Sequence, residues 1–417
     1  MEVFKFGGAS VKDAASVKNV LKVLQHTGFQ DKVIVVSAMG KMTNAFEVLV
    51  KKYLQKKGIP SEELSAIKNY HQEIALGLFS SKNNPVFSKI NELFADLENF
   101  MEHNKSTQYD FVYDQIVPYG ELLSTLIVSD FLKSNGIDHS WLDARQLIKT
   151  NSTYRDATVN WEETQQKVMG AIQPGKLYLT QGFIGADANN FTTTLGREGS
   201  DYSAAILAYC LNAQKVIIWK DVPGVLNADP RTFENPQLLH QISYEEAIEL
   251  AFFGASVIHP KTLQPLQRKE IPLYVKSFIE PEGEGTTVRK GQPLIPEVPC
   301  FIVKKDQVLI SLSTLDFSFM VEENISEIFR LFHQYQMKVD LIQNSAISFA
   351  VCVDNRFNNL EKLIQHLKAR FKVTYVPGVS LYTIRHFNEA ALKDLEKGKK
   401  ILLKQVMQNT VQLVSAN

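Results

Sequence analysis

The sequence predicts an α/β protein in which a parallel-rich β-sheet is sandwiched by helices and followed by smaller ferredoxin-like βαββαβ modules. Residues 1–37 alternate strand, helix and strand, the order of a βαβ unit. Further apolar strands recur among helical patterns, near 139–142, 177–181, 215–219 and 271–276. After a stretch rich in proline and glycine at 281–299, shorter elements follow in βαββαβ order.

The first element is a strand over Met1–Phe6, which ends at Gly7 and Gly8. Ser10 then has the position expected of an N-cap for an amphipathic helix. The next strand, 31–37 (DKVIVVS), is apolar on both faces, which is typical of a strand inside a parallel sheet. This opening unit therefore favours a sheet that is covered by helices on both sides.

Residues 44–135 have a mostly helical pattern, broken near 58–60 and 83–85 by glycine, proline and asparagine. Such a long helical excursion between strands predicts a lid or subdomain beside the sheet. Further helices are expected over 200–211 and 244–254.

The C-terminal part predicts two partly similar modules. The first has strands and helices in the order 306–312, 322–335, 338–343, 346–353, 357–370 and 371–376. The remainder predicts a strand, a helix and two strands, at 379–385, 388–397, 400–404 and 411–414. We read these elements as most of a second module.

Composition limits the classes of partner. The 417 residues are 45% hydrophobic and 22% charged, with 45 basic and 45 acidic side chains, so neither nucleic acid nor an acidic membrane is expected as the main partner. No apolar run approaches the roughly 20 residues that span a bilayer. The N-terminus reaches a glycine turn too soon for a signal peptide. Cys210, Cys300 and Cys352 lack metal-ligand spacing, and buried thiols fit a reducing, cytoplasmic compartment.

Two glycine motifs suggest anion binding. The opening KFGGASV places Lys5 and two glycines where a strand meets a helix, so that backbone N–H groups and a positive charge face one point. It is not a Walker A loop, and a plain glycine turn is the alternative. The segment 196–203 (GREGSDYS) again places glycines before a helix. Arg197 could hold a carboxylate there, and Asp201 could orient a lysine or simply cap the helix.

Three further segments carry weaker signals. The loop 222–231 (VPGVLNADPR) follows a strand's carboxyl end, where α/β folds bind ligands, and Asp221 and Arg231 flank it. Its alternative is an ordinary surface turn. His259 precedes a proline, so extended backbone and a structural role are expected. Glu121 stands at a helix start, as a cap or as a carboxylate facing a substrate ammonium.

Taken together and in this order, the motifs resemble those of the aspartate kinases of the amino-acid kinase family. That family shows K-F-G-G-x-S-V, then G-E, G-R-x-G-S-D, D-V-x-G-V with D-P-R, and G-A-x-V-x-H-P, and all occur here. The resemblance covers 1–290 as a catalytic domain and 300–417 as paired ACT-like regulatory modules. It implies that 306–375 is inserted in the other module and that strand 300–304 pairs with 376–417.

The resemblance implies that a monofunctional enzyme transfers the γ-phosphoryl group of ATP to the side-chain carboxylate of L-aspartate, with Mg²⁺ bound to ATP. This is the first step of lysine, threonine and methionine biosynthesis. The implied catalytic residues are Lys5 and Asp201. The implied aspartate-binding residues are Thr43, Glu121, Arg197 and Ser200. The implied ATP-binding residues are Lys5, Gly7, Gly8, Ser10, Lys220, Asp221 and Arg231.

The regulatory modules imply a lysine or threonine effector, bound in or after the strand Val339–Ile342 by Asp340, Gln343 and Asn344. ACT modules tend to pair across subunits, so a homodimer is expected. The reaction itself needs no general base, because the aspartate side chain, with a pKa near ~3.9, is already ionised at pH 7. What it needs is positive charge where a carboxylate meets a triphosphate.

Four positions depart from the family pattern. The family often has Gly where Glu198 stands, Thr at Lys220, an aromatic residue at Leu226 and Lys at Ser256. All four positions are expected on or near the nucleotide side of the site. They motivate an alternative, a weakly active or inactive relative that serves as an amino-acid-sensing partner subunit. A further alternative is another amino-acid kinase, such as a glutamate or acetylglutamate kinase.

Overall fold

The computed structural model describes residues 1–56, 58–81, 83–255, 257–316 and 318–416. The chain forms two compact units, each built from more than one segment. Unit 1 comprises Met1–Val225, Leu238–Ile248 and Val257–Leu294, and unit 2 comprises Leu226–Gln237, Glu249–Ser256 and Ile295–Asn417. No helix in the described ranges is long and apolar enough to cross a membrane.

Unit 1 contains an eight-stranded sheet in the order β10-β12-β11-β7-β1-β2-β4-β3. Its strands are β1 (Glu2–Phe6), β2 (Lys32–Val36), β3 (Ser140–Leu142), β4 (Leu177–Gln181), β7 (Lys215–Lys220), β10 (Gln241–Ser243), β11 (Leu273–Ser277) and β12 (Thr286–Arg289). Neighbours pair in parallel except β11 and β12, which are antiparallel. The predicted parallel-rich sheet is confirmed.

The central strand β1 fixes where the carboxyl ends of its neighbours lie. Phe6 is in register with Val36 of β2 and Trp219 of β7. The next residues along β2 and β7 therefore emerge at the edge where the Gly7-Gly8 turn begins. This is the edge at which parallel α/β sheets bind ligands.

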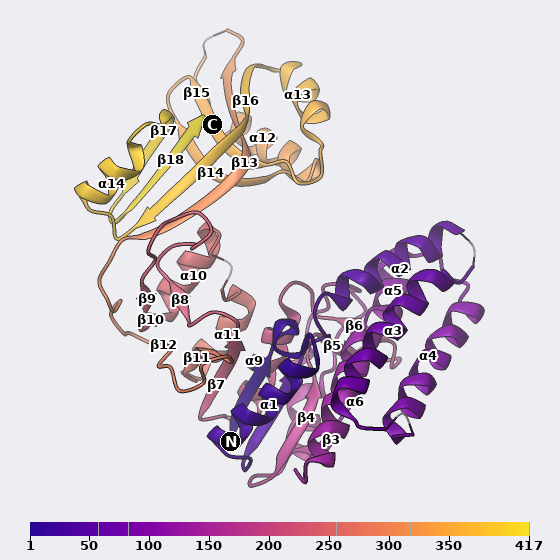
Figure 1. The fold of residues 1–417 in the computed structure, drawn as a ribbon. Coiled ribbons are helices and arrows are strands. Elements are labelled where there is room, and N and C mark those ends of the chain that lie inside the picture. Colours follow the sequence, from indigo (N-terminus) through magenta and orange to yellow (C-terminus); the bar gives the residue numbers. More distant parts are fainter. Residues whose placement is uncertain (57, 82, 256, 317, 417) are drawn as a thin grey trace. The chain divides into compact units, whose positions relative to one another are not determined.

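Helices cover this sheet and form the predicted excursion beside it (Figure 1). Those of the excursion, which lie together in Figure 1, are α2 (Met42–Lys56), α3 (Ser61–Leu78), α4 (Pro85–His103), α5 (Tyr109–Ile116) and α6 (Tyr119–Ser134). The others are α1 (Ala14–Thr27), α7 (Ala144–Leu147), α8 (Trp161–Ala171), α9 (Gly199–Leu211), α10 (Tyr244–Phe253) and α11 (Pro260–Arg268). The short strands β10 and β12 of the main sheet were not predicted from the sequence, and β12 lies inside the stretch 281–299 that is rich in proline and glycine. Four other short strands were not predicted either: β5 (Ile184–Ala186), β6 (Thr192–Thr194), β8 (Val225–Leu226) and β9 (Leu238–Leu239).

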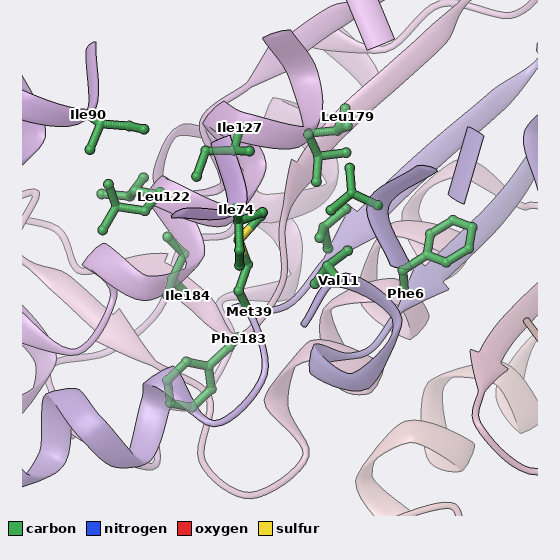
Figure 2. Close-up of a cluster of buried hydrophobic side chains, with 14 of the residues drawn as sticks. Phe6, Val11, Met39, Ile74, Ile90, Leu122, Ile127, Leu179, Phe183 and Ile184 are labelled. Carbon is green, nitrogen blue, oxygen red and sulfur yellow. The ribbon is translucent and has the colours of Figure 1, made fainter. Parts of the chain in front are cut away.

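One hydrophobic core joins the sheet to the helical excursion. Phe6 and Val11, from the opening of the chain, belong to the same buried cluster as Ile74 of α3 and Leu122 of α6. Figure 2 shows these side chains around Met39, which follows β2. The helices α2 to α6 are thus part of unit 1, and they hold the loop after β2 in place.

The predicted capping role of Ser10 is wrong. Ser10 lies inside a short 3₁₀ turn, Gly8–Val11, and α1 begins only at Ala14. Asp13 is the cap, and its carboxylate accepts a hydrogen bond from the Ser16 N–H at 2.7 Å. The extra turn moves the cap three residues along the chain, from Ser10 to Asp13.

Unit 2 contains a six-stranded sheet in the order β14-β15-β13-β16-β18-β17, with antiparallel neighbours throughout. Its elements are β13 (Cys300–Thr314), α12 (Glu322–Gln334), β14 (Lys338–Asn344), β15 (Ser348–Asp354), α13 (Leu360–Lys368), β16 (Phe371–Arg385), α14 (Glu389–Glu396), β17 (Lys400–Met407) and β18 (Thr410–Ala416). The predicted order of strands and helices is therefore present.

Two long strands run through both predicted modules. The predicted strands 371–376 and 379–385 are one strand, β16, and 300–304 and 306–312 are both parts of β13. Residues 300–304 pair with 381–385, as expected, while 307–314 pair with 371–379. A register shift after Lys304, where Asp306 has φ 58°, lets the ladder continue across both halves.

Candidate active site

A cavity of about 580 Å³ lies in unit 1, at the carboxyl-terminal edge of the sheet. Its walls include the ends of β1 and β7, residues after β2, the start of α6 and the loop that leads into α9. It brings together seven of the residues singled out in the sequence: Lys5, Thr43, Glu121, Arg197, Ser200, Asp201 and Lys220. Among the residues that the structure describes, no group of three or more His, Cys, Asp or Glu could hold a metal ion.

Two lysines flank one buried carboxylate in this cavity. The Nζ atom of Lys5 lies 2.6 Å from Oδ1 of Asp201, and that of Lys220 lies 3.4 Å from Oδ2. The side chain of Asp201 is only 3% exposed. Burial opposes its ionisation, but the two ammonium groups outweigh burial and hold the pKa of Asp201 below its ordinary value. Asp201 thus holds two ammonium groups at one point of the cavity wall.

The fold sets this cluster through three elements. β1 and β7 are neighbours in the sheet, and they carry Lys5 and Lys220 near their carboxyl ends. Helix α9 packs against both strands, with Asp201 in its first turn. The helix N-terminus adds the partial positive charge of its free N–H groups.

The cap of α9 differs from the prediction. Glu198, not Asp201, holds the N-cap position, and its φ of 52° and ψ of 30° are left-handed, a conformation that favours glycine. Its side chain makes no capping hydrogen bond. Burial raises the pKa of this carboxyl, and its Oε2 atom has no hydrogen-bond partner among the described residues.

Glu121 presents a buried carboxylate to the cavity. Its side chain does not cap α6, so the alternative role considered from the sequence does not apply. Oε1 accepts a hydrogen bond from the Ala38 N–H at 3.3 Å, while Oε2 is buried and, within the described ranges, has no partner. Glu121 is 1% exposed, and burial raises its pKa to about 8. A ligand that brings a cation would satisfy this group.

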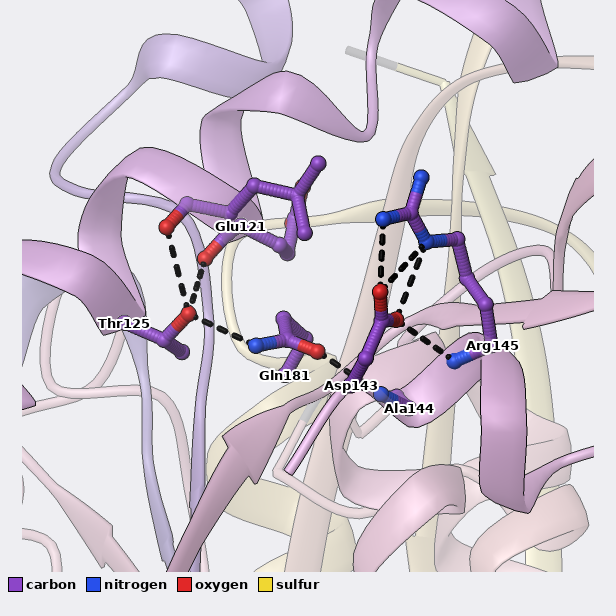
Figure 3. Close-up of polar contacts among 7 residues, drawn as sticks. Glu121, Thr125, Asp143, Ala144, Arg145 and Gln181 are labelled. Atoms are coloured by element: carbon purple, nitrogen blue, oxygen red, sulfur yellow. Dashed lines mark hydrogen bonds and ion pairs between the residues drawn. The ribbon is translucent and has the colours of Figure 1, made fainter. Parts of the chain in front are cut away.

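A chain of hydrogen bonds anchors the first turns of α6 to the sheet (Figure 3). The Thr125 hydroxyl donates to the Glu121 carbonyl at 2.9 Å and accepts from the Gln181 amide at 2.8 Å. The amide oxygen of Gln181, at the end of β4, accepts in turn from the Ala144 N–H at 2.8 Å. Glu121 therefore stands on a backbone that β4 and α7 hold in place.

Arg197 and Ser200 complete this side of the cavity. Arg197 is exposed, and in the part of the chain that the structure describes its guanidinium forms no hydrogen bond or ion pair. The Ser200 hydroxyl donates to that of Ser37 at 3.2 Å. Gly182 lets the chain approach, because a Cβ atom there would lie 2.6 Å from Cβ of Ser200.

The opening glycine turn packs closely against the segment that follows β2. A Cβ atom on Gly8 would lie 2.6 Å from the carbonyl oxygen of Gly40 and 2.9 Å from that of Ala38. The Gly40 N–H donates to the Gly8 carbonyl at 3.0 Å. The buried hydroxyl of Ser10 donates to the Trp219 carbonyl at 3.4 Å. Gly7, Gly8 and Ser10 are not among the described lining residues, and their ATP roles stay predictions.

The other residues predicted on the nucleotide side are not among the described residues that line this cavity. Asp221 is exposed directly after Lys220 and is not a lining residue. Arg231 belongs to unit 2, where its guanidinium pairs with Asp229 at 2.7 Å. Leu226 also belongs to unit 2, and Ser256 lies outside the described residues.

The predicted effector residues lie on the edge strand β14 of unit 2 or at its end. The side chain of Asp340 is 4% exposed and pairs with Lys304 at 2.8 Å and with Lys338 at 3.4 Å. Gln343 and Asn344 are exposed. Their effector role stays a prediction.

Sequence reasoning missed several lining residues, namely Ser37, Asn44, Tyr113, Arg155, Phe183 and Thr194. Ser37 and Asn44 bound the segment in which Thr43 was singled out, so proximity could have found them. Arg155 and Thr194 lie in segments without glycine patterns or strand periodicity. Only the packing of β6 and its neighbouring loop brings them to the cavity.

Comparisons with known proteins agree on one family. Residues 1–277 match the model of the amino acid kinase family. Lysine-sensitive aspartokinase 3 of Escherichia coli (strain K12) is 31% identical over 395 residues, covering 92% of this chain and 86% of that protein. The chloroplastic bifunctional aspartokinase/homoserine dehydrogenase 2 of Arabidopsis thaliana is 32% identical over 69% of this chain, which spans 32% of that longer protein.

Solved structures agree with the sequence comparisons. E. coli aspartokinase III in complex with lysine and aspartate (T-state) superposes with a TM-score of 0.81 and 29% identity, covering 99% of this chain and 95% of that one. The same enzyme with aspartate and ADP (R-state) gives a TM-score of 0.81 and 28% identity, over 100% and 96%. The predicted fold class, a helix-covered sheet followed by regulatory modules, is thereby confirmed.

Proposed function

Because the chain belongs to the amino acid kinase family, and within it to the aspartokinases, we propose that it converts ATP and L-aspartate to ADP and 4-phospho-L-aspartate. The observation that carries this proposal is one cavity with two kinds of group. Lys5 and Lys220 flank Asp201 at one place, and Glu121 and Arg197 offer a carboxylate and a guanidinium elsewhere on the wall. The first set suits a phosphoryl group, and the second suits an α-amino acid.

The chemistry follows from these charges. The β-carboxylate of aspartate is ionised at neutral pH, so it can attack the γ-phosphorus without a general base. Its approach to a triphosphate needs positive charge, which Lys5 and Lys220 supply while Asp201 keeps them in position. Removing one such preorganised donor typically costs ~10²–10³ in rate.

Recognition of the amino acid would use one acidic and one basic side chain. Glu121 would accept hydrogen bonds from the substrate ammonium through its unpartnered Oε2, and Arg197 would hold the α-carboxylate bidentately. Thr43 and Ser200, both on the cavity wall, would add hydroxyl contacts.

The finer assignments are proposals of the same kind. Mg²⁺ would enter with ATP, on its phosphates, and Gly7, Gly8, Ser10, Asp221 and Arg231 would lie on the nucleotide side. We further propose that 1–290 form the catalytic domain, that 300–417 form the regulatory modules of a homodimer, and that the enzyme is cytoplasmic. Because the E. coli relative is lysine-sensitive, lysine is the first effector to test, with Asp340, Gln343 and Asn344 as its contacts.

The proposal is tested by measuring ADP formation with Mg·ATP and aspartate in wild type and Arg197→Ala. We expect aspartate-dependent turnover, and a KM for aspartate raised roughly 10–100-fold in the variant with the KM for ATP unchanged, as for a lost charged hydrogen bond. Arg356→Ala, which removes an exposed arginine of unit 2, is the matched control. Aspartate binding without any ADP formation would favour an amino-acid-sensing subunit instead.

A further inference from the structure

Arg155 places a second arginine on the wall of the same cavity that Arg197 lines. It lies in the loop before α8, and no sequence motif assigns it a role. Its backbone has φ 69°, in the left-handed region that glycine adopts without steric cost. The chain therefore keeps a large cationic side chain at a position whose backbone favours glycine, which is a common feature of functional sites.

A buried carboxylate holds this loop in place. Asp114 of α5 is fully buried, and its Oδ2 accepts hydrogen bonds from the Arg155 N–H at 2.9 Å and the Thr194 N–H at 2.8 Å. Its Oδ1 accepts from the Thr194 hydroxyl at 2.7 Å. Thr194 also lines the cavity. Asp114 thus joins α5, β6 and the Arg155 loop at one buried point.

The guanidinium of Arg155 contacts the rings of Tyr109 and Tyr113 and one exposed carboxylate. It lies over the ring of Tyr113, 4.6 Å from the ring centroid, and Tyr113 is itself a lining residue. It pairs with Asp110 through one contact of 3.2 Å, between side chains that are 42% and 62% exposed. Exposed pairs of this kind contribute little, so a substrate carboxylate in the cavity can replace Asp110. Stacking on tyrosine leaves the N–H groups at the guanidinium edge available.

The loops that carry Arg155 and Arg197 are in direct contact. A Cβ atom on Gly196, whose φ is 79°, would lie 3.3 Å from the Arg155 carbonyl oxygen and 2.6 Å from Oδ1 of Asp156. The backbone stretches that carry the two arginines therefore adjoin, and both arginines line the cavity. Such a pair suits one carboxylate held from two sides.

Arg155 belongs to the amino-acid side of the cavity. The cations that pair with Asp201, where the phosphoryl group would arrive, are Lys5 and Lys220. By contrast, Arg155 stacks on Tyr113 and adjoins the loop of Arg197, and these residues line the cavity together with Glu121. This side of the cavity is where Glu121 and Arg197 would hold the substrate ammonium and the α-carboxylate.

We propose that Arg155 and Arg197 together bind the α-carboxylate of the substrate, with Asp114 as the positioning residue of Arg155. The inference rests on the proposed aspartate kinase function and adds a specificity determinant to it. Two arginines at this point would require an anionic α-carboxylate. Analogues of the substrate with a neutral group in place of the α-carboxylate should therefore bind weakly.

The test uses Arg155→Gly, because glycine accepts the φ of 69° and the fold should be kept. We expect the KM for L-aspartate to rise roughly 10–100-fold, as for loss of a charged hydrogen bond. The KM for ATP should be unchanged, and the melting temperature should not be lowered. Aspartate α-amide keeps the ammonium and the acceptor carboxylate but lacks the α-anion. The difference between wild type and variant should shrink to less than threefold with this analogue.

Two results would overturn the inference: an aspartate KM within twofold of wild type in Arg155→Gly, or an equal penalty with the α-amide. Calorimetric titration of aspartate gives the same comparison without turnover. An enzyme that failed to phosphorylate aspartate would therefore defeat the proposed function, while binding would still decide the role of Arg155.

The positioning role of Asp114 has its own readout. Asp114→Asn should raise the aspartate KM more than it lowers kcat, and the double variant with Arg155→Gly should have the KM of Arg155→Gly alone. Penalties that multiply would show that Asp114 acts independently of Arg155 and would refute the positioning role. Asp110→Asn removes the exposed competitor, so its aspartate KM should fall or stay unchanged, and a rise would contradict the exchange of partners.

Discussion

Aspartate binding should release a proton from Glu121. This carboxyl is buried, with a pKa raised to about 8, so roughly nine-tenths of the free protein carries it protonated at pH 7. The substrate ammonium would favour the ionised form, because it would pair with the oxygen that has no partner in the described structure. Binding at pH 7 should therefore release about 0.9 proton per site.

The size of the effect follows from the same pKa. One pKa unit above pH 7 means that ionising Glu121 costs about 1.4 kcal/mol, which is taken from the binding free energy. The Kd for aspartate should fall about tenfold from pH 6 to pH 7, about fivefold from pH 7 to pH 8, and little beyond.

As the pH rises, the stability of the free protein should fall while its affinity for aspartate increases. The folded-state pKa of Glu121 lies above its unfolded value of 4.5, so the native state retains a proton that the unfolded chain has lost. The free energy of unfolding of the free protein should decrease as the pH rises from about 4.5 to about 8, by up to roughly 5 kcal/mol for a shift of about 3.5 units. Aspartate, or the substitution Glu121→Gln, should remove most of this decrease.

Isothermal titration calorimetry at pH 7, in two buffers with different ionisation enthalpies, measures the proton count directly. Glu121→Gln should release no proton and bind aspartate roughly 10–100-fold more weakly. Glu162→Gln, an exposed glutamate of α8, is the control and should behave as wild type. Equal binding enthalpies in the two buffers for the wild-type protein would refute the assignment of Glu121.

Three further predictions follow from particular contacts. Glu198→Gly should raise the free energy of unfolding by up to ~1 kcal/mol in urea titrations, because it removes a glutamate from a left-handed backbone. It should also lower the KM for ATP, because it removes a carboxylate beside the proposed phosphate site, and a higher KM would contradict this. Lys220→Met should raise the KM for ATP roughly 10–100-fold and that for aspartate little, and equal effects on both would refute its assignment. Gly8→Ala should cost ~1–3 kcal/mol of stability, since a Cβ atom would lie 2.6 Å from the Gly40 carbonyl oxygen, and an unchanged urea midpoint would contradict the packing.

Much of the site could be predicted because parallel strands end at one edge of a sheet. Lys5 and Lys220 come near the ends of β1 and β7, so the topology alone brings their side chains close to the start of α9. For Glu121, the sequence left two roles open, a helix cap and a carboxylate that faces a ligand. Its burial, and not its position at a helix start, distinguishes a ligand-facing carboxylate from a cap.

Other features depend on contacts that no local pattern records. Arg155 reaches the cavity through Asp114, which lies 41 residues earlier in the sequence, and through a left-handed backbone that is unusual for arginine. Asp13 replaces Ser10 as a cap because a 3₁₀ turn intervenes. In unit 2, β13 and β16 each join two strands that were predicted separately, because pairing along the whole ladder keeps the chain extended.

The measurement that tests the central claim most directly is hydroxylamine trapping of the acyl phosphate. Purified protein would be supplied with Mg·ATP and, separately, with L-aspartate, L-glutamate and N-acetylglutamate. Hydroxamate should form with aspartate and not with the two longer acids, and it should require Lys5, so that Lys5→Met forms at least ~100-fold less. Hydroxamate from glutamate or acetylglutamate in preference to aspartate, or none from any acid while ATP still binds, would contradict the assignment.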